Sequence, residues 1–571
     1  MTTPKTPLPD GRQRFGFVGR GWPRRFPSAR RQDRRRSAEH RRERLGQDPR
    51  STGDPLRLAV FAVFAVAAAA IVSAGGAVSA RAAQTPGARS PASHLRFVTI
   101  APGEALESIV SKASRVVPSP NQLAWQEREF IAFAHFGMNT FTDREWGDGK
   151  EPPSLFNPTD FDARQWVQVF KAAGMKLLIL TAKHHDGFCL WPTATTTHSV
   201  KSSPWKNGRG DVVAEVARAC REAGLAFGVY VSPWDRHEPS YGDSPRYNEV
   251  FRTQLRELLT NYGEIAEVWF DGAMGEGPNG KRQVYDWPSY YRVVRELQPK
   301  AVIFGMAPDV RWVGTESGYG RETEWSVVPV RLREGATPDA GSPHPLDEAF
   351  VPGDLTAPDL GSREAIRSAS VLAWYPAETD VSIRPGWFHH AKQDAQVKTP
   401  AKLVDIYFSS VGRNGLLLLN VPPDTRGRIA DADVTSLQGM RALLDRALTA
   451  PVAEARPPGP PRSQGPATVY EAPIGGGRAF DVALLQEDIR LGQRVEQFTL
   501  ELCAGADCRE FARGTTIGYK RLLRFPEVQV APALRDARIR LTAGQARGTP
   551  AVSAVAVYRM GPSGPQAPAP E

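Results

Sequence analysis

Asp271 is the first residue whose type and position could serve catalysis. Asp271 follows an apolar run over 266–270 and precedes Gly272 in the segment Trp269-Phe270-Asp271-Gly272. Because burying an unpaired carboxylate is costly, Asp271 must either face a solvated site or have a partner. A helix N-cap and a loop salt bridge are the structural alternatives to catalysis. The position alone leaves the catalytic and the structural interpretation equally open.

A second carboxyl group would make glycoside hydrolysis possible. A retaining glycosidase holds its acid/base about 5–5.5 Å from its nucleophile. Glu316 ends the segment PDVRWVGTE, which we place in the loop after a strand predicted over 301–305. Adjacent strands of a barrel can bring two such groups together. Asp309, Glu322 and Glu324 are competing candidates, and the pattern alone excludes none of them.

Two adjacent histidines follow another predicted strand, at 176–181. His184 and His185, with Asp186 beside them, could ligate a metal. Adjacent residues on an extended segment point to opposite sides, however, so we favour two neutral imidazoles that donate to sugar hydroxyls. The structural alternative is one buried, satisfied histidine and one that faces solvent.

Tryptophans recur in or near the same loops. The apolar faces of sugars stack on aromatic rings, which bury a large area at little cost in entropy. Most tryptophans in proteins are core residues, so we expect half of these at a site. The six are Trp146, Trp191, Trp234, Trp269, Trp312 and Trp387.

The elements that must position these residues alternate between strands and helices from about residue 120. Such alternation predicts a doubly wound sheet or a (β/α)8 barrel. Polar and aromatic groups follow the ends of three successive strands, which favours the barrel, and no phosphate-binding glycine motif follows any strand. Strands are expected at 176–181, 225–231, 266–270, 301–305, 371–375 and 416–420, and helices at 211–223 (with Asp211 as N-cap), 247–262, 288–297 and 401–410.

The fold class is therefore α/β, with a (β/α)8-type barrel followed by an antiparallel β-sandwich. Short alternating runs such as 498–502 and 552–558 predict the sandwich. We divide the chain into a leader at 1–82, a linker at 83–116 with one short helix near 104–113, a catalytic barrel at 117–450, a Pro/Gly-rich linker at 451–466, a sandwich at 467–560 and a disordered tail at 561–571.

The net charge of +10 lies in the leader. Residues 1–57 hold 16 basic and 6 acidic residues, so the remainder of the chain is neutral and gives no support for nucleic-acid binding. The apolar run 58–72 and the Ala80-Arg81-Ala82 segment after it are typical of a signal peptide. An uncleaved signal anchor is the alternative, and it is the one predicted link to a membrane. Both interpretations predict an exported protein, periplasmic or secreted.

Four cysteines are few for 571 residues. Cys503 and Cys508 are close enough in sequence for a hairpin disulfide in an oxidising compartment. Two free thiols are an equally open alternative. Nothing in the sequence indicates an oligomeric state.

Five motifs, in order over about 120–430, resemble family 29 glycoside hydrolases, the α-L-fucosidases. They are the segments FAHFGMNTF from Phe133, EWGDG from Glu145, KHHDGF from Lys183, WFDG from Trp269, and VGRNG from Val411 continuing to LNVPP from Leu419. The resemblance implies a retaining double displacement with Asp271 as nucleophile. It also implies a fucose pocket lined by His135, Glu145, Trp146, His184, His185, Tyr230, Trp269 and Trp387.

The segment PDVRWVGTE resembles a pattern of one subfamily in which the glutamate is the acid/base. The resemblance therefore implies Glu316 as the acid/base of this chain. Members of that subfamily prefer α-1,3/1,4-linked fucose on branched, Lewis-type glycans. The expected substrate is thus a fucosylated oligosaccharide or glycoconjugate, with no cofactor and no catalytic metal. A non-catalytic fucose-binding lectin and a retaining exo-glycosidase for another sugar are the alternatives.

Overall fold

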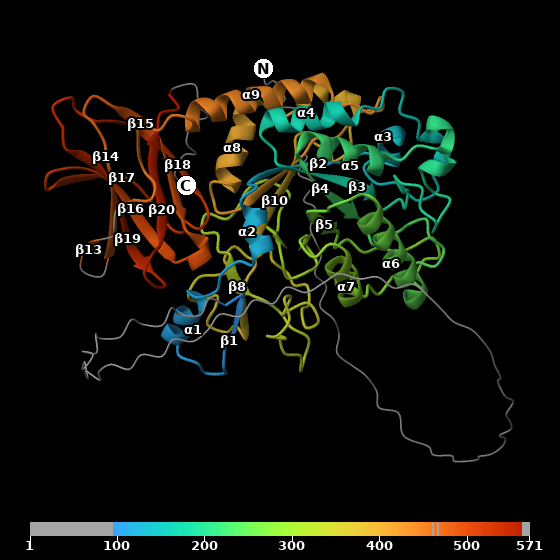
Figure 1. Ribbon diagram of the computed structural model, residues 1–571, viewed down its shortest axis with the longest axis horizontal. Coiled ribbons are helices and arrows are strands. Elements are labelled where there is room, and N and C mark those ends of the chain that lie inside the picture. Colours follow the sequence, from blue (N-terminus) through green and yellow to red (C-terminus); the bar gives the residue numbers. More distant parts are fainter. Residues whose placement is uncertain (1–94, 459–461, 465–466, 562–571) are drawn as a thin grey trace, which may run out of the picture. The chain divides into compact units, whose positions relative to one another are not determined.

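The computed structural model describes residues 95–458, 462–464 and 467–561 (Figure 1). These residues belong to one compact unit, in which a barrel precedes a β-sandwich along the chain. The predicted leader, and the predicted tail from residue 562 on, lie outside them. None of the described helices combines the length and the apolar character needed to cross a membrane.

Eight parallel strands form a nearly closed barrel and follow one another around it in chain order. The sheet has β6 and β7 at its two edges, and a parallel bridge between Phe304 and Val310 lies where these edges meet. The predicted barrel is therefore confirmed. The strands are β2 (Phe130–Ala134), β3 (Leu177–Lys183), β4 (Ala226–Val231), β5 (Glu267–Phe270), β6 (Val302–Phe304), β7 (Arg311–Trp312), β10 (Ala377–Ser382) and β11 (Leu416–Asn420).

Apolar side chains pack on both faces of these strands. In β3, Leu177 and Ile179 join the cluster inside the barrel, whereas Leu178 and Leu180 join the layer under the outer helices. A strand buried on both faces reads as a continuous apolar run, which is why this strand could be predicted.

Helices cover most of the outside of the barrel (Figure 1). Helix α5 begins where predicted, because the Asp211 side chain accepts a hydrogen bond from the backbone N–H of Ala214. In the described chain, no helix connects β6 to β7 or β7 to β10. The helices are α2 (Pro120–Gln126), α3 (Met138–Thr142), α4 (Ala163–Ala173), α5 (Val212–Ala223), α6 (Ser244–Asn261), α7 (Trp287–Leu297), α8 (Pro400–Ser410) and α9 (Asp431–Leu448).

A small antiparallel sheet contains the strand predicted at 371–375 and part of the predicted linker. Strand β9 (Val371–Trp374) pairs with β1 (Phe97–Thr99) and β8 (Val327–Pro329), so the strand predicted at 371–375 exists but lies outside the barrel. The described part of the predicted linker at 83–116 contains β1, which was not predicted, and helix α1 (Leu106–Ala113), which is the short helix expected near 104–113. The apolar side chains of these two elements, among them Val98 and Ile109, are buried in one cluster and hold the segment in place.

The C-terminal region is a sandwich of a four-stranded and a five-stranded antiparallel sheet. The sandwich begins earlier than predicted, because two of its strands, β12 and β13, lie within the predicted linker at 451–466. Strand β12 pairs with β20, and β13 pairs with β14. The strands are β12 (Ala453–Ala455), β13 (Arg462–Gln464), β14 (Ala467–Pro473), β15 (Ala479–Glu487), β16 (Val495–Ala504), β17 (Asp507–Gly514), β18 (Arg521–Gln529), β19 (Ala537–Ala546) and β20 (Val552–Tyr558).

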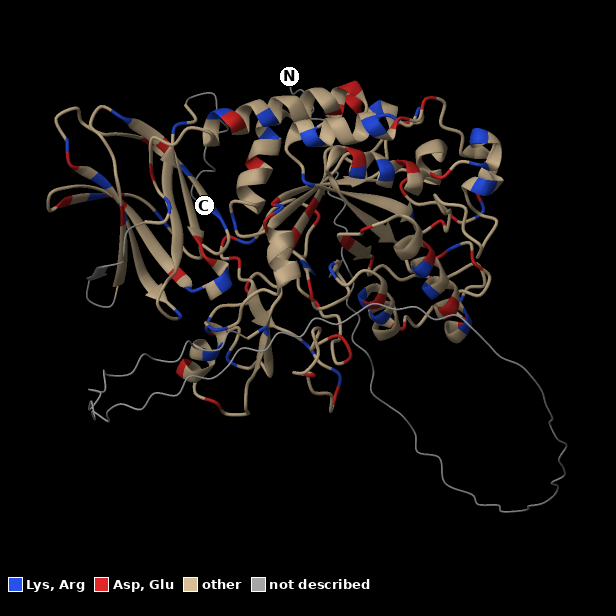
Figure 2. Cartoon of the chain, in the orientation of Figure 1, with Lys and Arg blue, Asp and Glu red and all other residues tan. Residues whose placement is uncertain are grey.

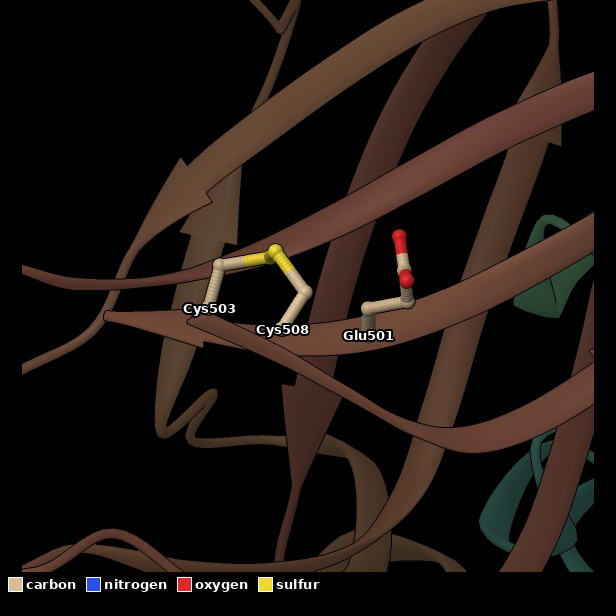
Figure 3. A group of neighbouring side chains, drawn as sticks. All are labelled: Glu501, Cys503 and Cys508. Atoms are coloured by element: carbon tan, nitrogen blue, oxygen red, sulfur yellow. A yellow bond between two sulfur atoms is a disulfide. The ribbon is translucent and has the colours of Figure 1, made fainter. Parts of the chain in front are cut away.

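Cys503 and Cys508 are joined in a disulfide across the β16–β17 hairpin, where they are direct partners in the register (Figure 3). Glu501 lies close to both sulfurs, but a disulfide leaves no thiolate to ligate a metal there. Cys189 and Cys220 are buried free thiols. Charges of both signs are interspersed over the barrel helices and the sandwich (Figure 2).

Candidate active site

Asp271 lies just past the end of β5, and both of its carboxylate oxygens have donors. The Tyr230 hydroxyl donates to Oδ2 at 2.8 Å, and the backbone N–H of Ala273 donates to Oδ1 at 2.7 Å. His185 Nε2 is 3.7 Å from Oδ2, and the Asp271 side chain keeps 23% of its surface exposed. The carboxylate is therefore held in one direction and remains open to a ligand.

Three histidines surround this carboxylate from neighbouring strands. Asn420 Oδ1 accepts from His135 Nδ1 at 2.8 Å, and Ser232 Oγ lies 2.7 Å from His185 Nδ1. Burial lowers the pKa of His135 to about 3 and holds the pKa of His184 well below its usual value. Burial also lowers the pKa of His185, although the Asp271 charge opposes this. All three imidazoles are consequently neutral near pH 7 and offer hydrogen bonds without a charge.

The structure corrects the orientation expected for the histidine pair. Strand β3 ends at Lys183, so His184 and His185 lie in the turn beyond it and not on an extended segment. Their ring centroids are 4.2 Å apart, the His184 ring stacks 5.9 Å from that of Tyr230, and His185 lies beside Asp271. Side chains alternate between the two faces only within a strand, and β3 ends one residue before His184.

Glu145 and Trp146 reach the pocket from the loop after α3. The Glu145 carboxylate accepts from the backbone N–H of Trp387 at 2.7 Å, and His390 Nε2 lies 2.6 Å from it. A Cβ atom on Gly386 would lie 2.2 Å from this carboxylate, so glycine permits the close approach. Trp146 is 56% exposed, and its ring contacts His185 edge-on.

His390 is a site residue that the sequence did not reveal. Its second ring nitrogen, Nδ1, contacts the carboxylate of Asp143, so the imidazole bridges two acidic side chains. Asp143 also pairs with Lys392. The lone signal was its place three residues after Trp387, since its partners lie about 245 residues earlier in the chain.

Glu316 follows β7, a two-residue strand that the sequence prediction missed. The residue is exposed, but its carboxylate accepts a hydrogen bond from the Trp387 indole N–H. Loss of hydration raises the pKa of Glu316, and the negative charges of Asp271 and Glu145 raise it further. Trp387 thus connects two acidic groups, Glu145 through its backbone and Glu316 through its ring.

The competing carboxylates have structural partners instead. Glu324 is fully buried and pairs with Arg311, and Asp309 pairs with Arg295 at 2.7 Å. Glu322 pairs with Arg413 at 2.7 Å and also with Arg521. Arg295 also pairs with Asp347. Asp309, His344 and Asp347 are the second group of neighbouring side chains of metal-ligand type among the described residues.

Four of the six tryptophans lie beside the histidines or Tyr230, where half of them were expected. Measured between ring centroids, Trp269 lies 5.2 Å from Tyr230, Trp387 lies 5.1 Å from His135, and Trp234 lies 4.9 Å from His185. Trp146 contacts His185, as described above. Trp191 is a core residue that donates to Glu257, and Trp312 donates to Asp380 at 2.8 Å.

Asp380 and Glu378 point into the barrel from β10, and the sequence prediction missed both. Burial raises the pKa of Asp380 to about 8, and the negative charges of Glu316 and Asp271 add to the effect. Glu378 accepts from the Trp269 indole at 2.9 Å. Strand β10 has the sequence AETDVS, which contains no apolar run by which it could have been predicted.

The barrel, the two carboxyl groups at the ends of its strands, the neutral histidines and the aromatic walls together define a glycoside hydrolase. A model of the alpha-L-fucosidase family matches residues 112–447. The chain belongs to this family, family 29 of the glycoside hydrolases, and is an α-L-fucosidase that acts on fucose-containing substrates.

Relatives of the chain extend this similarity over most of its length. Alpha-L-fucosidase 1 of Arabidopsis thaliana is 43% identical over 471 residues, which cover 77% of this chain and 87% of the plant protein. A crystal structure from Bacteroides ovatus is 49% identical and has a TM-score of 0.75, with 84% of this chain and 80% of that chain covered.

The family 29 fucosidase of Ruminococcus gnavus, solved in complex with fucose, is also similar to this chain. It is 31% identical, with a TM-score of 0.65 and coverage of 78% of this chain and 95% of that chain. The barrel and the sandwich are thus shared with solved fucosidases.

Proposed function

We propose that this fucosidase is a retaining exo-enzyme that releases terminal α-1,3- or α-1,4-linked L-fucose from branched glycans. The observation that carries the proposal is the pairing of two unlike carboxyl groups. Asp271 has both oxygens fixed by donors, whereas Glu316 has a raised pKa beside it. Two carboxyl groups whose surroundings push their protonation apart are suited to the roles of nucleophile and acid.

In the first step, an oxygen of Asp271 attacks the anomeric carbon while Glu316 gives its proton to the departing glycosidic oxygen. The bond to the aglycone breaks and a covalent fucosyl-enzyme forms. In the second step, Glu316 takes a proton from water, the water oxygen attacks the anomeric carbon, and Asp271 leaves. Two inversions at the same carbon release fucose with its configuration retained.

The remaining residues of the pocket would bind the sugar. His135, His184 and His185 are neutral donors suited to ring hydroxyls, and the Glu145 carboxylate is suited to accept from them. Trp146, Tyr230, Trp269 and Trp387 offer aromatic surface to the C6 methyl group and the apolar face of the ring.

Two measurements test this proposal. Proton NMR during hydrolysis of a branched trisaccharide should show the α-anomer of L-fucose first, with the β-anomer appearing only by mutarotation. Initial appearance of the β-anomer would refute retention. A panel of α-1,2-, α-1,3-, α-1,4- and α-1,6-linked fucosides should be cleaved fastest at the 1,3 and 1,4 linkages, and a preference for 1,2 or 1,6 would refute the linkage assignment.

We also propose that the enzyme is exported, either cleaved from its leader or anchored by it. The disulfide between Cys503 and Cys508 supports this, because such bonds persist in oxidising compartments. N-terminal sequencing of the protein from culture supernatant and from membranes distinguishes cleavage after Ala82 from retention of the leader. A protein found only in the cytoplasm would contradict export.

A further inference from the structure

The segment that carries Glu316 has no regular structure of its own. Residues 313–326 run from β7 to β8 without a helix or strand. Backbone groups in such a segment lack the partners that a helix or sheet would supply, so its conformation depends on contacts from elsewhere. Those contacts decide how well a carboxyl group on the segment is positioned.

Side chains of the β-sandwich supply many of these contacts. Arg521, on β18, donates to the backbone carbonyl of Glu322 at 2.7 Å and pairs with the Glu322 carboxylate. Thr515, in the loop before β18, hydrogen-bonds with the Thr323 hydroxyl at 2.9 Å. Arg521 is 2% exposed, so its donors have no water to replace these partners.

Gln493 holds the next part of the segment by both ends of its amide. Its Oε1 accepts from the backbone N–H of Ser326 at 2.7 Å, and its Nε2 donates to the carbonyl of Glu324 at 2.9 Å. Gln493 is 1% exposed. Beside it, the Arg547 guanidinium lies 3.5 Å above the Trp325 ring.

A further chain of contacts reaches the segment closer to Glu316. Arg524, also on β18, pairs with Asp405 at 2.8 Å, and the Tyr319 hydroxyl donates to the same carboxylate at 2.6 Å. Tyr319 is three residues after Glu316. At its neighbour, the backbone N–H of Gly320 donates to the carbonyl of Ser409 at 2.7 Å.

We propose that the sandwich positions the acid/base of the barrel, with Arg521, Gln493 and Arg524 as positioning residues for Glu316. The proposal rests on the role of Glu316 given above. Each contact falls on the segment after Glu316 or on its support, and Gln493→Met would leave the buried Ser326 N–H without the acceptor that holds it. A displacement of about 1 Å at a reacting group costs about 100-fold in rate, so a slack segment would impair proton transfer first.

Two substrates separate proton transfer from the rest of catalysis. The leaving alkoxide of a fucosyl glycan needs a proton from Glu316, whereas the fluoride of α-L-fucosyl fluoride leaves without one. The ratio kcat/KM covers the steps up to the fucosyl-enzyme, in which fluoride or the aglycone departs. A defect confined to the position of Glu316 therefore lowers kcat/KM for the glycan and spares the fluoride.

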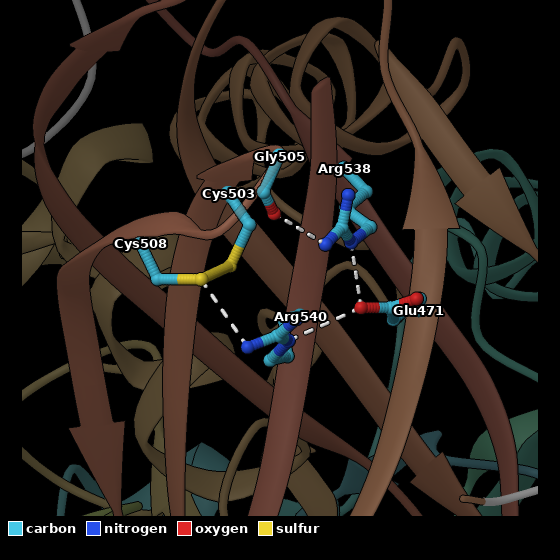
Figure 4. Close-up of a disulfide and its surroundings, with 6 residues drawn as sticks. All are labelled: Glu471, Cys503, Gly505, Cys508, Arg538 and Arg540. Carbon is cyan, nitrogen blue, oxygen red and sulfur yellow. Dashed lines mark hydrogen bonds and ion pairs between the residues drawn. A yellow bond between two sulfur atoms is a disulfide. The ribbon is translucent and has the colours of Figure 1, made fainter. Parts of the chain in front are cut away.

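Arg521→Met and Gln493→Met remove the donors and keep the length of the side chains. We expect kcat/KM for an α-1,3-fucosyl glycan to fall about 10- to 100-fold and that for the fluoride by less than about 3-fold. The matched control is Arg538→Met in the same sandwich, since the Arg538 side chain hydrogen-bonds with Glu471 and Gly505 at the five-stranded sheet (Figure 4). The control should leave both values unchanged.

Glu316→Ala distinguishes failure of this proposal from failure of the function assigned to Glu316. If Glu316→Ala lowers kcat/KM equally for the glycan and the fluoride, Glu316 is not the acid. If Glu316→Ala instead lowers kcat/KM for the glycan alone, while Arg521→Met and Gln493→Met change kcat/KM equally for both substrates or for neither, the sandwich does not position Glu316. Tyr319→Phe removes one hydroxyl from the Arg524 chain and serves if a larger change unfolds the protein; equal effects on both substrates would overturn the proposal there too.

Discussion

Strand β5 carries a carboxyl group near each end, and the two groups have opposite surroundings. Glu267 and Trp269 alternate along the strand and share its inner face, and Asp271 follows directly after the strand ends. Glu267 is fully buried, whereas the Asp271 side chain is 23% exposed at the mouth of the barrel. The same residue class thus serves as structure at one end of the strand and as chemistry at the other.

The inner group is one half of a buried acid pair. Glu267 hydrogen-bonds with Glu378 across the barrel, the Trp125 indole donates to Glu267 at 2.9 Å, and the Trp269 indole donates to Glu378 at 2.9 Å. Burial raises the pKa of Glu267 to about 7, and burial together with the neighbouring Glu267 raises the pKa of Glu378 well above its usual value. Two such groups in contact in a dry interior share a proton and do not both ionise.

The outer pair differs in what lies between its members. Asp271 and Glu316 come from different loops, and each is directed by a separate donor, the Tyr230 hydroxyl and the Trp387 indole. Their donors are separate, whereas the two members of the inner pair bind each other. Catalysis therefore depends on carboxyl groups that are oriented but not consumed by one another.

Removal of the nucleophile should give the largest effect of any change at the outer pair. Asp271→Ala leaves the neutral histidines and the aromatic walls in place but removes the atom that forms the fucosyl-enzyme. We expect release of fucose from a branched trisaccharide to fall by about 10³-fold or more, with an unchanged melting temperature. Wild-type turnover in this variant would remove the contrast between the two pairs.

The inner pair should give the opposite result. Glu378→Leu removes the carboxyl group that shares a proton with Glu267 and leaves the Trp269 N–H without an acceptor, so the free energy of unfolding should fall by about 2–4 kcal/mol. Chemical denaturation measures this, with Glu378→Gln as the control that keeps an acceptor and a donor. A loss of activity without a loss of stability in Glu378→Leu would mean that the inner pair is catalytic.

The inner pair should also contribute a pH dependence of stability with a defined sign. Because the pKa of Glu267 is raised to about 7, the unfolded carboxyl group ionises first as the pH rises. The free energy of unfolding contributed by the pair should therefore fall from about pH 5 to about pH 7. Glu378→Gln should flatten this fall, because its amide can donate to ionised Glu267. Equal slopes in both proteins would contradict the shared proton.

A smaller effect is expected from the support of the outer site. His390→Asn removes the bridge that holds Glu145, whose carboxylate we assign to sugar binding. We expect KM for the glycan to rise about 3- to 10-fold while kcat changes by less than about 2-fold. A fall in kcat with an unchanged KM would instead place His390 in the chemical step.

The smallest effect should be a shift of the alkaline limb of the pH profile. In the proposed mechanism the protonated form of Glu316 is the acid, so kcat/KM should fall as the pH rises through its pKa. The Trp387 N–H stabilises the ionised form and lowers this pKa, so Trp387→Phe should move the limb upward by about half a pH unit to one unit. A downward shift would contradict the hydrogen bond.

Much of the barrel could be predicted because its strands are apolar on both faces. Runs such as that of β3 show this directly, and they also located Asp271, His184 and His185 at the strand ends. Strand β10 could not be found this way, since Glu378, Asp380 and Ser382 face the barrel interior. Polar side chains inside a barrel erase the apolar pattern by which a strand is predicted.

The partners that make the site work were beyond prediction from local pattern. Glu316 depended on a two-residue strand, and its preference over Glu322 and Glu324 depended on which carboxylates had arginine partners. His390 and Trp387 reach Glu145 from about 240 residues away. Such contacts follow from the closed barrel and not from neighbours in the sequence.

Azide products test the central claim most directly. In Asp271→Gly, azide can replace the missing carboxylate and attack the fucosyl glycoside once, so the product should be β-L-fucosyl azide. In Glu316→Ala, with α-L-fucosyl fluoride as the substrate because its fluoride leaves without a proton, azide should intercept the fucosyl-enzyme on Asp271 and give α-L-fucosyl azide after two inversions. The same azide anomer from both variants, or the reverse assignment, would contradict the account of Asp271 as nucleophile and Glu316 as acid/base.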